Sequence, residues 1–229
     1  MNFKFLIALC LIFNFTSQSV FSQDSTPATD SKAPKLQLSL DKIIEGIEKI
    51  YNVPGFSAQF VQESTIKAME LTDVASGKIF VKRPGMMRWV YEKPYKQIII
   101  TNGKKLWIYK PEDNQVMLGK APAFFGDGKG AGFLADIKIL RHKFNITLPE
   151  QKDSRYFMLK LVPIERTFEL AEIFLSVSRS TFKVNKIVTY NSYGDENRID
   201  LINFRFDVLP AEDLFTFSIP EGVDVLELE

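Results

Sequence analysis

The sequence of 229 residues contains a single cysteine, Cys10, which lies within an apolar segment near the N-terminus. A lipid-attachment site would have a small residue before this cysteine, but Leu9 precedes it, so we interpret Cys10 as an ordinary residue of an export signal. A chain that has lost this signal contains no cysteine. It therefore has neither a disulfide framework nor a thiolate site.

Histidine is equally rare, because His142 is the only one, and we expect it to be a solvated side chain at the end of a helix. One histidine without cysteine cannot build a Cys/His zinc site, and no G-x-S-x-G motif accompanies it. The glycine-rich run 126–132 is not a phosphate loop, since Lys129 is followed by Gly130 instead of Ser or Thr. We therefore expect no catalytic residue, no metal, no cofactor and no enzymatic activity.

The chain also lacks an excess of charge of either sign and any long apolar run. It has 29 Lys and Arg against 28 Asp and Glu, without a basic cluster, so we expect no nucleic-acid partner. The apolar run 5–15 is too short to span a bilayer. With Lys4 before it and Val20-Phe21-Ser22 after it, this run has the form of a cleaved secretory signal.

Three segments follow from this pattern. We predict a signal peptide over 1–22, a disordered leader rich in Ser, Thr, Pro and Ala over 23–38, and a folded domain over 39–229. Export without an anchor and without disulfides predicts a soluble protein of the periplasm.

Short strand patterns separated by turn signals fill most of the chain after residue 52. About eleven of them, with few helices, predict a mainly β (α+β) fold in which a single curved antiparallel sheet forms an open half-barrel. The predicted strands are 56–63, 65–72, four strands within 77–118, then 144–148, 156–162, 173–178, 184–190, 199–208 and 214–219.

Two helical segments accompany the strands. Ser39 is placed to cap a helix over 40–51 with one apolar face, which needs a sheet to cover. Within 121–144, the glycine-rich run leads to Phe133, Leu134 and Ile137, whose i, i+1, i+4 spacing puts them on one face of a short helix. This segment is either a hinged lid or a surface loop with a docked helix.

The stretch 77–118 is apolar on both faces of its strands. Side chains alternate between the two faces of a strand, so Arg83 shares a face with Ile79 and Val81. In the same way Met87, Trp89 and Tyr91 share one face of the next strand, and Leu106 and Ile108 share one face of a later strand. A half-solvated sheet has a cleaner alternation, so we expect these strands to be covered on both sides. The 20 Phe and six Met supply a core and some side chains to line a cavity.

The same stretch resembles the periplasmic outer-membrane lipoprotein carrier proteins (LolA). The resemblance rests on G-x-x-x-V-K-R-P from Gly77, then Trp89, then P-x(n)-D/N-G-K-x-L-W-x-Y from Pro94 to Tyr109. In addition, 56–62 is similar to the first strand of that family, and 215–223 is similar to its C-terminal strand and turn.

This resemblance implies a carrier that binds the acyl chains of lipoproteins in a hydrophobic cavity and moves them from the inner to the outer membrane. The implied partners are acylated lipoproteins as cargo, an inner-membrane lipoprotein-releasing ABC transporter and an outer-membrane acceptor; we expect a monomer. In this arrangement the helix 40–51 packs on the convex face of the sheet and the concave face holds the chains.

The resemblance also implies that a helical lid closes the half-barrel. Arg83 occupies the K-R-P position and would latch the lid, made of Phe133, Leu134 and Ile137, through backbone carbonyls of the glycine-rich and lid segments. The expected lining of the cavity is Phe60, Ile79, Val81, Met87, Trp89, Tyr91, Ile98, Ile100, Leu106 and Ile108.

Three alternatives stay open. A lipid-sensing or regulatory half-barrel protein would usually need a second domain, for which 229 residues leave no room. A membrane-side lipoprotein acceptor should have a lipid-attachment cysteine at the cleavage site, where Ser22 and Gln23 stand instead. A periplasmic hydrolase would use two carboxylates as acid and base, but nothing in the sequence selects two of the 28.

Overall fold

The computed structural model describes residues 38–125 and 131–228. The predicted signal peptide with Cys10, most of the predicted leader, and residues 126–130 of the glycine-rich run lie outside the described residues. From Leu38 onward the chain forms one compact unit.

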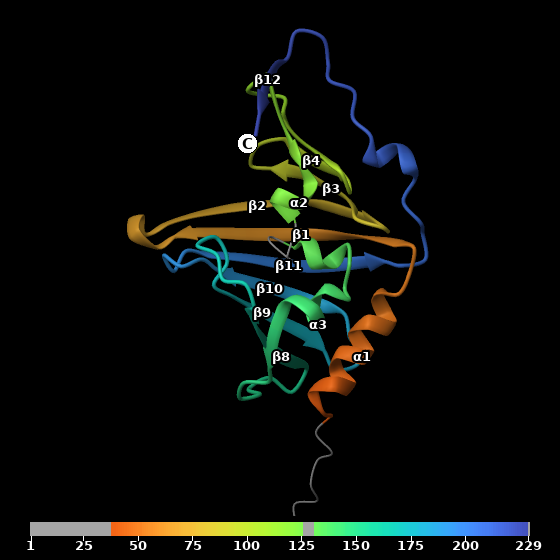
Figure 1. The fold of residues 1–229 in the computed structure, drawn as a ribbon, viewed down its shortest axis with the longest axis vertical. Helices are drawn as coiled ribbons and strands as arrows, with labels where there is room; N and C mark the ends of the chain where they lie inside the picture. The colour runs from red at the N-terminus through yellow and green to blue at the C-terminus, as the bar shows by residue number, and fades with distance from the viewer. Residues whose placement is uncertain (1–37, 126–130, 229) are drawn as a thin grey trace, which may run out of the picture. The chain divides into compact units, whose positions relative to one another are not determined.

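The twelve strands of the described chain form one open sheet in the order β12-β6-β5-β4-β3-β2-β1-β11-β10-β9-β8-β7 (Figure 1). Neighbours are antiparallel except β12 and β6, which are parallel, so the sheet is mixed. The mainly β fold with an open sheet is therefore confirmed. The strands are β1 Gly55–Ile66, β2 Leu71–Lys82, β3 Met86–Lys93, β4 Gln97–Asn102, β5 Lys105–Lys110, β6 Gln115–Lys120, β7 Phe144–Thr147, β8 Tyr156–Pro163, β9 Glu172–Ser178, β10 Val184–Tyr190, β11 Glu196–Arg205 and β12 Asp224–Glu227.

Three strand predictions need correction. The predicted break between 56–63 and 65–72 is absent, because β1 continues to Ile66 and the chain turns at the 3-10 helix η1 (Lys67–Met69). Five strands, not four, pass through 77–118. The predicted strand 214–219 is wrong, since its first residues belong to the 3-10 helix η4 (Glu212–Phe215) and the last strand is β12.

The helix α1 (Leu40–Tyr51) begins and ends as predicted. Ser39 caps it by accepting a hydrogen bond from the backbone N–H of Lys42 at 3.4 Å. The other helical elements are short: α2 Ala121–Phe125, the 3-10 helix η3 Gly132–Leu134 and α3 Ile139–Lys143. The predicted single lid helix through 133–137 is therefore wrong, because the segment is a 3-10 turn, a bend and then α3.

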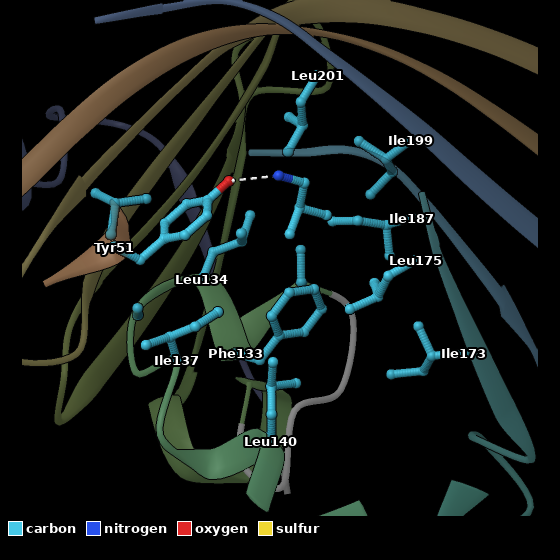
Figure 2. Packing of buried hydrophobic residues seen from close by; sticks show 14 of the residues in the cluster. Tyr51, Phe133, Leu134, Ile137, Leu140, Ile173, Leu175, Ile187, Ile199 and Leu201 are labelled. Atoms are coloured by element: carbon cyan, nitrogen blue, oxygen red, sulfur yellow. Dashed lines mark hydrogen bonds between the residues drawn. The ribbon is translucent and has the colours of Figure 1, made fainter. Parts of the chain in front are cut away.

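One face of the sheet carries a continuous buried apolar layer, which we call the inner face. Cross-strand pairs share a face, so it runs from Val81 of β2 through Phe56 of β1 to the strands of the other half. Buried residues of α1 and of 131–140 belong to the same cluster. Figure 2 shows Tyr51 of α1 beside Leu134 and Phe133, over strand residues such as Leu175.

The prediction that α1 covers the opposite, convex face is therefore wrong. Both faces of several strands are apolar, and the amphipathic pattern of α1 does not distinguish between them. The outer face is instead covered in part by η4, which packs on β3 and β4. Its Phe215 is buried, and the outer-face Arg88 donates a hydrogen bond to the carbonyl of Leu214 at 2.9 Å.

Candidate functional site

The inner face brings together eight of the ten residues predicted to line a cavity. Tyr91 is half-buried, and the other seven are buried. The seven are Phe60, Ile79, Val81, Met87, Trp89, Leu106 and Ile108.

Ile98 and Ile100 do not lie on this face, and their assignment to the lining is wrong. The register of β3 and β4 pairs them with Val90 and Arg88, whereas Ile99 pairs with Trp89. Ile99 therefore takes their place in the inner cluster. The hairpin that joins β4 to β5 through Gly103 and Lys104 would have revealed this, because it pairs Ile99 with Ile108.

The lid segment, residues 131–143, fills the space over the inner face with apolar side chains. Phe133 and Leu134 in η3 are completely buried, and Ile137, in the bend before α3, is 4% exposed. Leu140 of α3 joins them (Figure 2). Sequence reasoning missed Leu140, although it stands three residues after Ile137, a helical spacing.

Arg83 connects the lid to the end of α1. Its Nη1 donates to the carbonyl of Val53 at 2.7 Å, and its Nη2 donates to the carbonyl of Leu134 at 3.1 Å. Burial lowers the pKa of the guanidinium, although nearby Asp136 opposes this. The expected bond to the lid is present, and the second partner is Val53.

A second tie joins α3 to α1. Arg141 lies within hydrogen-bond distance of Glu48, with 2.7 Å from Nε to Oε1, and of Asp41, with 3.4 Å from Nη1 to Oδ1. The hydroxyl of Tyr51, in α1, accepts a hydrogen bond from the backbone N–H of Val184 at 3.1 Å (Figure 2). The lid and α1 therefore form one cover, which the contacts of Arg83 and Tyr51 attach to the sheet.

A cleft of about 1200 Å³ opens beside Arg83. Its walls are the end of α1, the turns 83–85 and 102–104, and residues 135–142 of the lid segment. Most of the residues that line it have polar or charged side chains, and they include His142, which is exposed. The apolar layer is thus closed off from this cleft by the lid and by Arg83.

The described ranges, 38–125 and 131–228, contain neither a metal-binding cluster nor a membrane-crossing helix. No group of three or more His, Cys, Asp or Glu side chains there is placed to hold a metal ion. None of the helices there has the length and apolar character needed to cross a bilayer.

Comparison with known proteins identifies the group to which this architecture belongs. The family described as "Outer membrane lipoprotein carrier protein LolA" matches residues 51–218, well over half of the chain. The chain belongs to the LolA family. Among curated relatives of this family, an outer-membrane lipoprotein carrier protein of Legionella pneumophila (strain Lens) is 31% identical over 229 residues, covering 99% of this chain and all of the relative.

More distant relatives agree with the family assignment. The outer-membrane lipoprotein carrier protein of Pseudomonas paraeruginosa is 29% identical over 152 residues, which cover 66% of this chain and 71% of that protein. Among solved structures, an uncharacterized conserved protein from Thermus thermophilus aligns with a TM-score of 0.52 at 13% identity, over 83% of this chain and 100% of that one. At this identity the likeness shows that the two chains share a fold and nothing further.

Proposed function

We propose that this protein carries acylated lipoproteins between the two membranes of the cell envelope and holds their acyl chains on the inner face. The observation that supports this most is the cover itself. A continuous apolar layer of the sheet lies beneath a segment that carries four apolar side chains, Phe133, Leu134, Ile137 and Leu140. Margin contacts such as those of Arg83 with the carbonyls of Val53 and Leu134 hold this segment closed.

The latch has a strength suited to a reversible cover. A hydrogen bond from a charged donor contributes about 1.5–3 kcal/mol net, and one such bond of Arg83, to the carbonyl of Leu134, holds the lid. Incoming acyl chains supply more than this, since burial of each methylene is worth about 0.8 kcal/mol. A guanidinium also reaches and releases carbonyls without a change of protonation.

Cargo must also leave. Full burial of three chains of about fifteen methylenes would be worth roughly 36 kcal/mol. Non-covalent affinities saturate near ~18–21 kcal/mol. A carrier that releases its cargo therefore buries the chains in part, or spends much of the gain on displacing its lid.

The remaining parts of the proposal concern location and partners. The protein would be made with a cleaved signal peptide over 1–22 and would act as a soluble monomer in the periplasm. It would receive lipoproteins from an inner-membrane ABC transporter and deliver them to an outer-membrane acceptor. The family of carrier proteins to which the chain belongs supports this route. The proposed role is that of a carrier and not of an enzyme.

Native mass spectrometry of protein isolated from the periplasm without detergent tests the proposal. We expect co-purified acylated polypeptide, and we expect the apo-protein to take up a fluorescent acyl probe. Ile137→Ser should weaken uptake, because it removes an apolar contact between the lid and the bound acyl chain, whereas Lys138→Ser at an exposed neighbouring position should not. Absence of both bound lipid and probe uptake would reject the carrier function.

A further inference from the structure

A buried hydrogen-bond donor on the inner face has no acceptor. In the part of the chain that the structure describes, two buried side-chain atoms lack a hydrogen-bond partner, Trp89 Nε1 and Arg198 Nε. Arg198 Nε lies 3.2 Å from a carboxylate oxygen of Asp200, so its charge is balanced. Trp89 is 4% exposed and has no such neighbour. Leaving a buried N–H unpaired costs free energy, and such a group in a native fold calls for an explanation.

Trp89 stands where the inner face changes from apolar to polar. Its neighbour on the same face of β3, on the side towards Arg83, is Met87, and both side chains are buried. Towards the other end comes Tyr91, whose hydroxyl donates to Gln62 Oε1 at 2.8 Å. Gln62 in turn donates to Asn197 Oδ1 at 2.7 Å.

The polar group beyond Trp89 is neutral. It consists of Gln62, Ser64, Tyr91 and Asn197, connected by hydrogen bonds of 2.7–3.2 Å. The rings of Phe60 and Tyr91 meet edge-on at 4.9 Å beside Gly77, where a side chain would collide with the carbonyl of Val90. Burial raises the pKa of Tyr91 to about 12, which keeps this hydroxyl a donor. The group thus offers hydrogen bonds without a charge.

We propose that Trp89 Nε1 donates a hydrogen bond to the carbonyl oxygen that links an acyl chain to the rest of the cargo. This inference rests on the proposed carrier function and assigns the ligand an orientation. The acyl chain of the lipid would lie under the lid, on the side of Trp89 that faces Arg83. Its ester or amide carbonyl would accept the hydrogen bond from Trp89, and the polar part of the lipid would face Gln62 and Asn197.

The chemistry of Trp89 and its surroundings selects this ligand. An indole N–H is a donor only, so its partner must be an acceptor. A phosphate or carboxylate would need a cation for compensation, and the polar group contains none. An acylated lipid has the required order of groups, with methylenes, one neutral acceptor and then polar atoms. A hydrocarbon chain alone would leave Nε1 unpaired.

The test compares two lipids that differ at this acceptor. Dipalmitoylglycerol has ester carbonyls, and dihexadecylglycerol has ether oxygens in their place and chains of matched length. We expect the wild-type protein to bind the ester roughly 2- to 12-fold more tightly, the ratio expected for one neutral hydrogen bond. Trp89→Phe retains an aromatic ring but removes the N–H, and it should bind the two lipids equally.

Trp107 provides a matched control. It is the second of two tryptophans and pairs with Ile100 on the outer face, so Trp107→Phe should retain the preference for the ester. In ¹⁵N-labelled protein each variant also identifies one of the two indole N–H signals by NMR. The signal of Trp89 should move downfield with the ester and not with the ether, a change that a purely structural role would not produce.

The possible failures are distinguishable. If both lipids bind but the wild type shows no preference, or Trp89→Phe retains it, the hydrogen bond is refuted and the carrier function stands. An unchanged Trp89 signal on ester binding refutes it in the same way. If neither lipid binds the wild type, both the inference and the carrier function are rejected.

Discussion

The guanidinium of Arg141 in α3 donates two hydrogen bonds to the carboxylate of Glu48 in α1, from Nε to Oε1 at 2.7 Å and from Nη2 to Oε2 at 3.3 Å. The pair bridges two elements that are far apart in the sequence and both lie on the inner face. It gives the lid a second attachment, to α1, in addition to the contact of Leu134 with Arg83. We expect substitutions at the two attachments to have different effects on the lid.

Glu48→Ala should loosen the lid without unfolding the sheet. A partly exposed ion pair contributes about 0.2–1 kcal/mol, so hydrogen exchange of amides in 131–143 should become up to about five-fold faster. Glu45→Ala is the matched control, because its partner Lys42 lies on the same helix and ties α1 to nothing else. Equal effects of the two substitutions would show that Glu48 acts only through helix stability.

Arg83→Leu should leave the fold intact and shift the balance towards bound cargo. The variant loses the charge-assisted bond to the lid carbonyl of Leu134, worth about 1.5–3 kcal/mol, so the closed lid competes less well with acyl chains. We expect equal or tighter binding of an acyl probe and slower transfer to an acceptor.

Arg88→Leu is the control for Arg83→Leu. It also removes a guanidinium bonded to a backbone carbonyl, but on the outer face, against Leu214. Its probe binding and transfer should match those of the wild type. Wild-type behaviour of Arg83→Leu in both assays would mean that Arg83 is not a latch.

Ile99 and Ile100 distinguish the two faces of β4. Both are buried, so each change to Ala should destabilise the fold by about 2–5 kcal/mol. Only Ile99 belongs to the inner cluster. Ile99→Ala should therefore weaken acyl-probe binding, by about four-fold for each methylene group that no longer touches the probe. An equal reduction of binding in Ile100→Ala, measured where both variants are folded, would contradict this.

Tyr91 should make the free energy of unfolding depend on pH above about pH 10, the ordinary pKa of a tyrosine. Burial raises its pKa from 10.0 to about 12, so the fold favours the neutral phenol. This contribution is complete below about pH 10 and is lost as the pH rises through about 12. A shift of two units corresponds to about 2–3 kcal/mol.

Denaturant unfolding of the wild type and Tyr91→Phe between about pH 9 and 12 measures this contribution. The stability advantage of the wild type over the variant should shrink as the pH rises. Tyr193→Phe, at a position that is 75% exposed, should follow the wild type throughout. A constant difference between wild type and Tyr91→Phe would show that the phenol does not titrate in this window.

Local signals made part of the fold predictable. Ser39 and the isoleucine spacing fixed the limits of α1, since capping and amphipathicity are encoded within a few residues. Alternation alone placed Arg83 on the inner face, where a buried guanidinium must find acceptors.

Other features depend on contacts between distant residues. Three isoleucines in succession, 98–100, carry no alternation, so their register with β3 and β5 decides which one faces inward. The alternating pattern at 214–219 looks like a strand, but its apolar residues serve the outer face: Phe215 is buried and Phe217 lies 5.3 Å from Tyr109 between ring centres. The four residues of β12 pair with β6 more than a hundred positions away. Val53 was missed as a partner of Arg83 for the same reason.

In the proposed carrier, the apolar side chains of the lid compete with the cargo for the inner face. Phe133, Leu134, Ile137 and Leu140 are covalently tethered to the surface that they cover, so their effective concentration there is high and independent of dilution. The apparent affinity for cargo is the intrinsic affinity multiplied by the fraction of molecules whose lid is displaced. In this scheme each release ends in the same closed lid, which opposes rebinding and favours passage of the cargo from this protein to an acceptor.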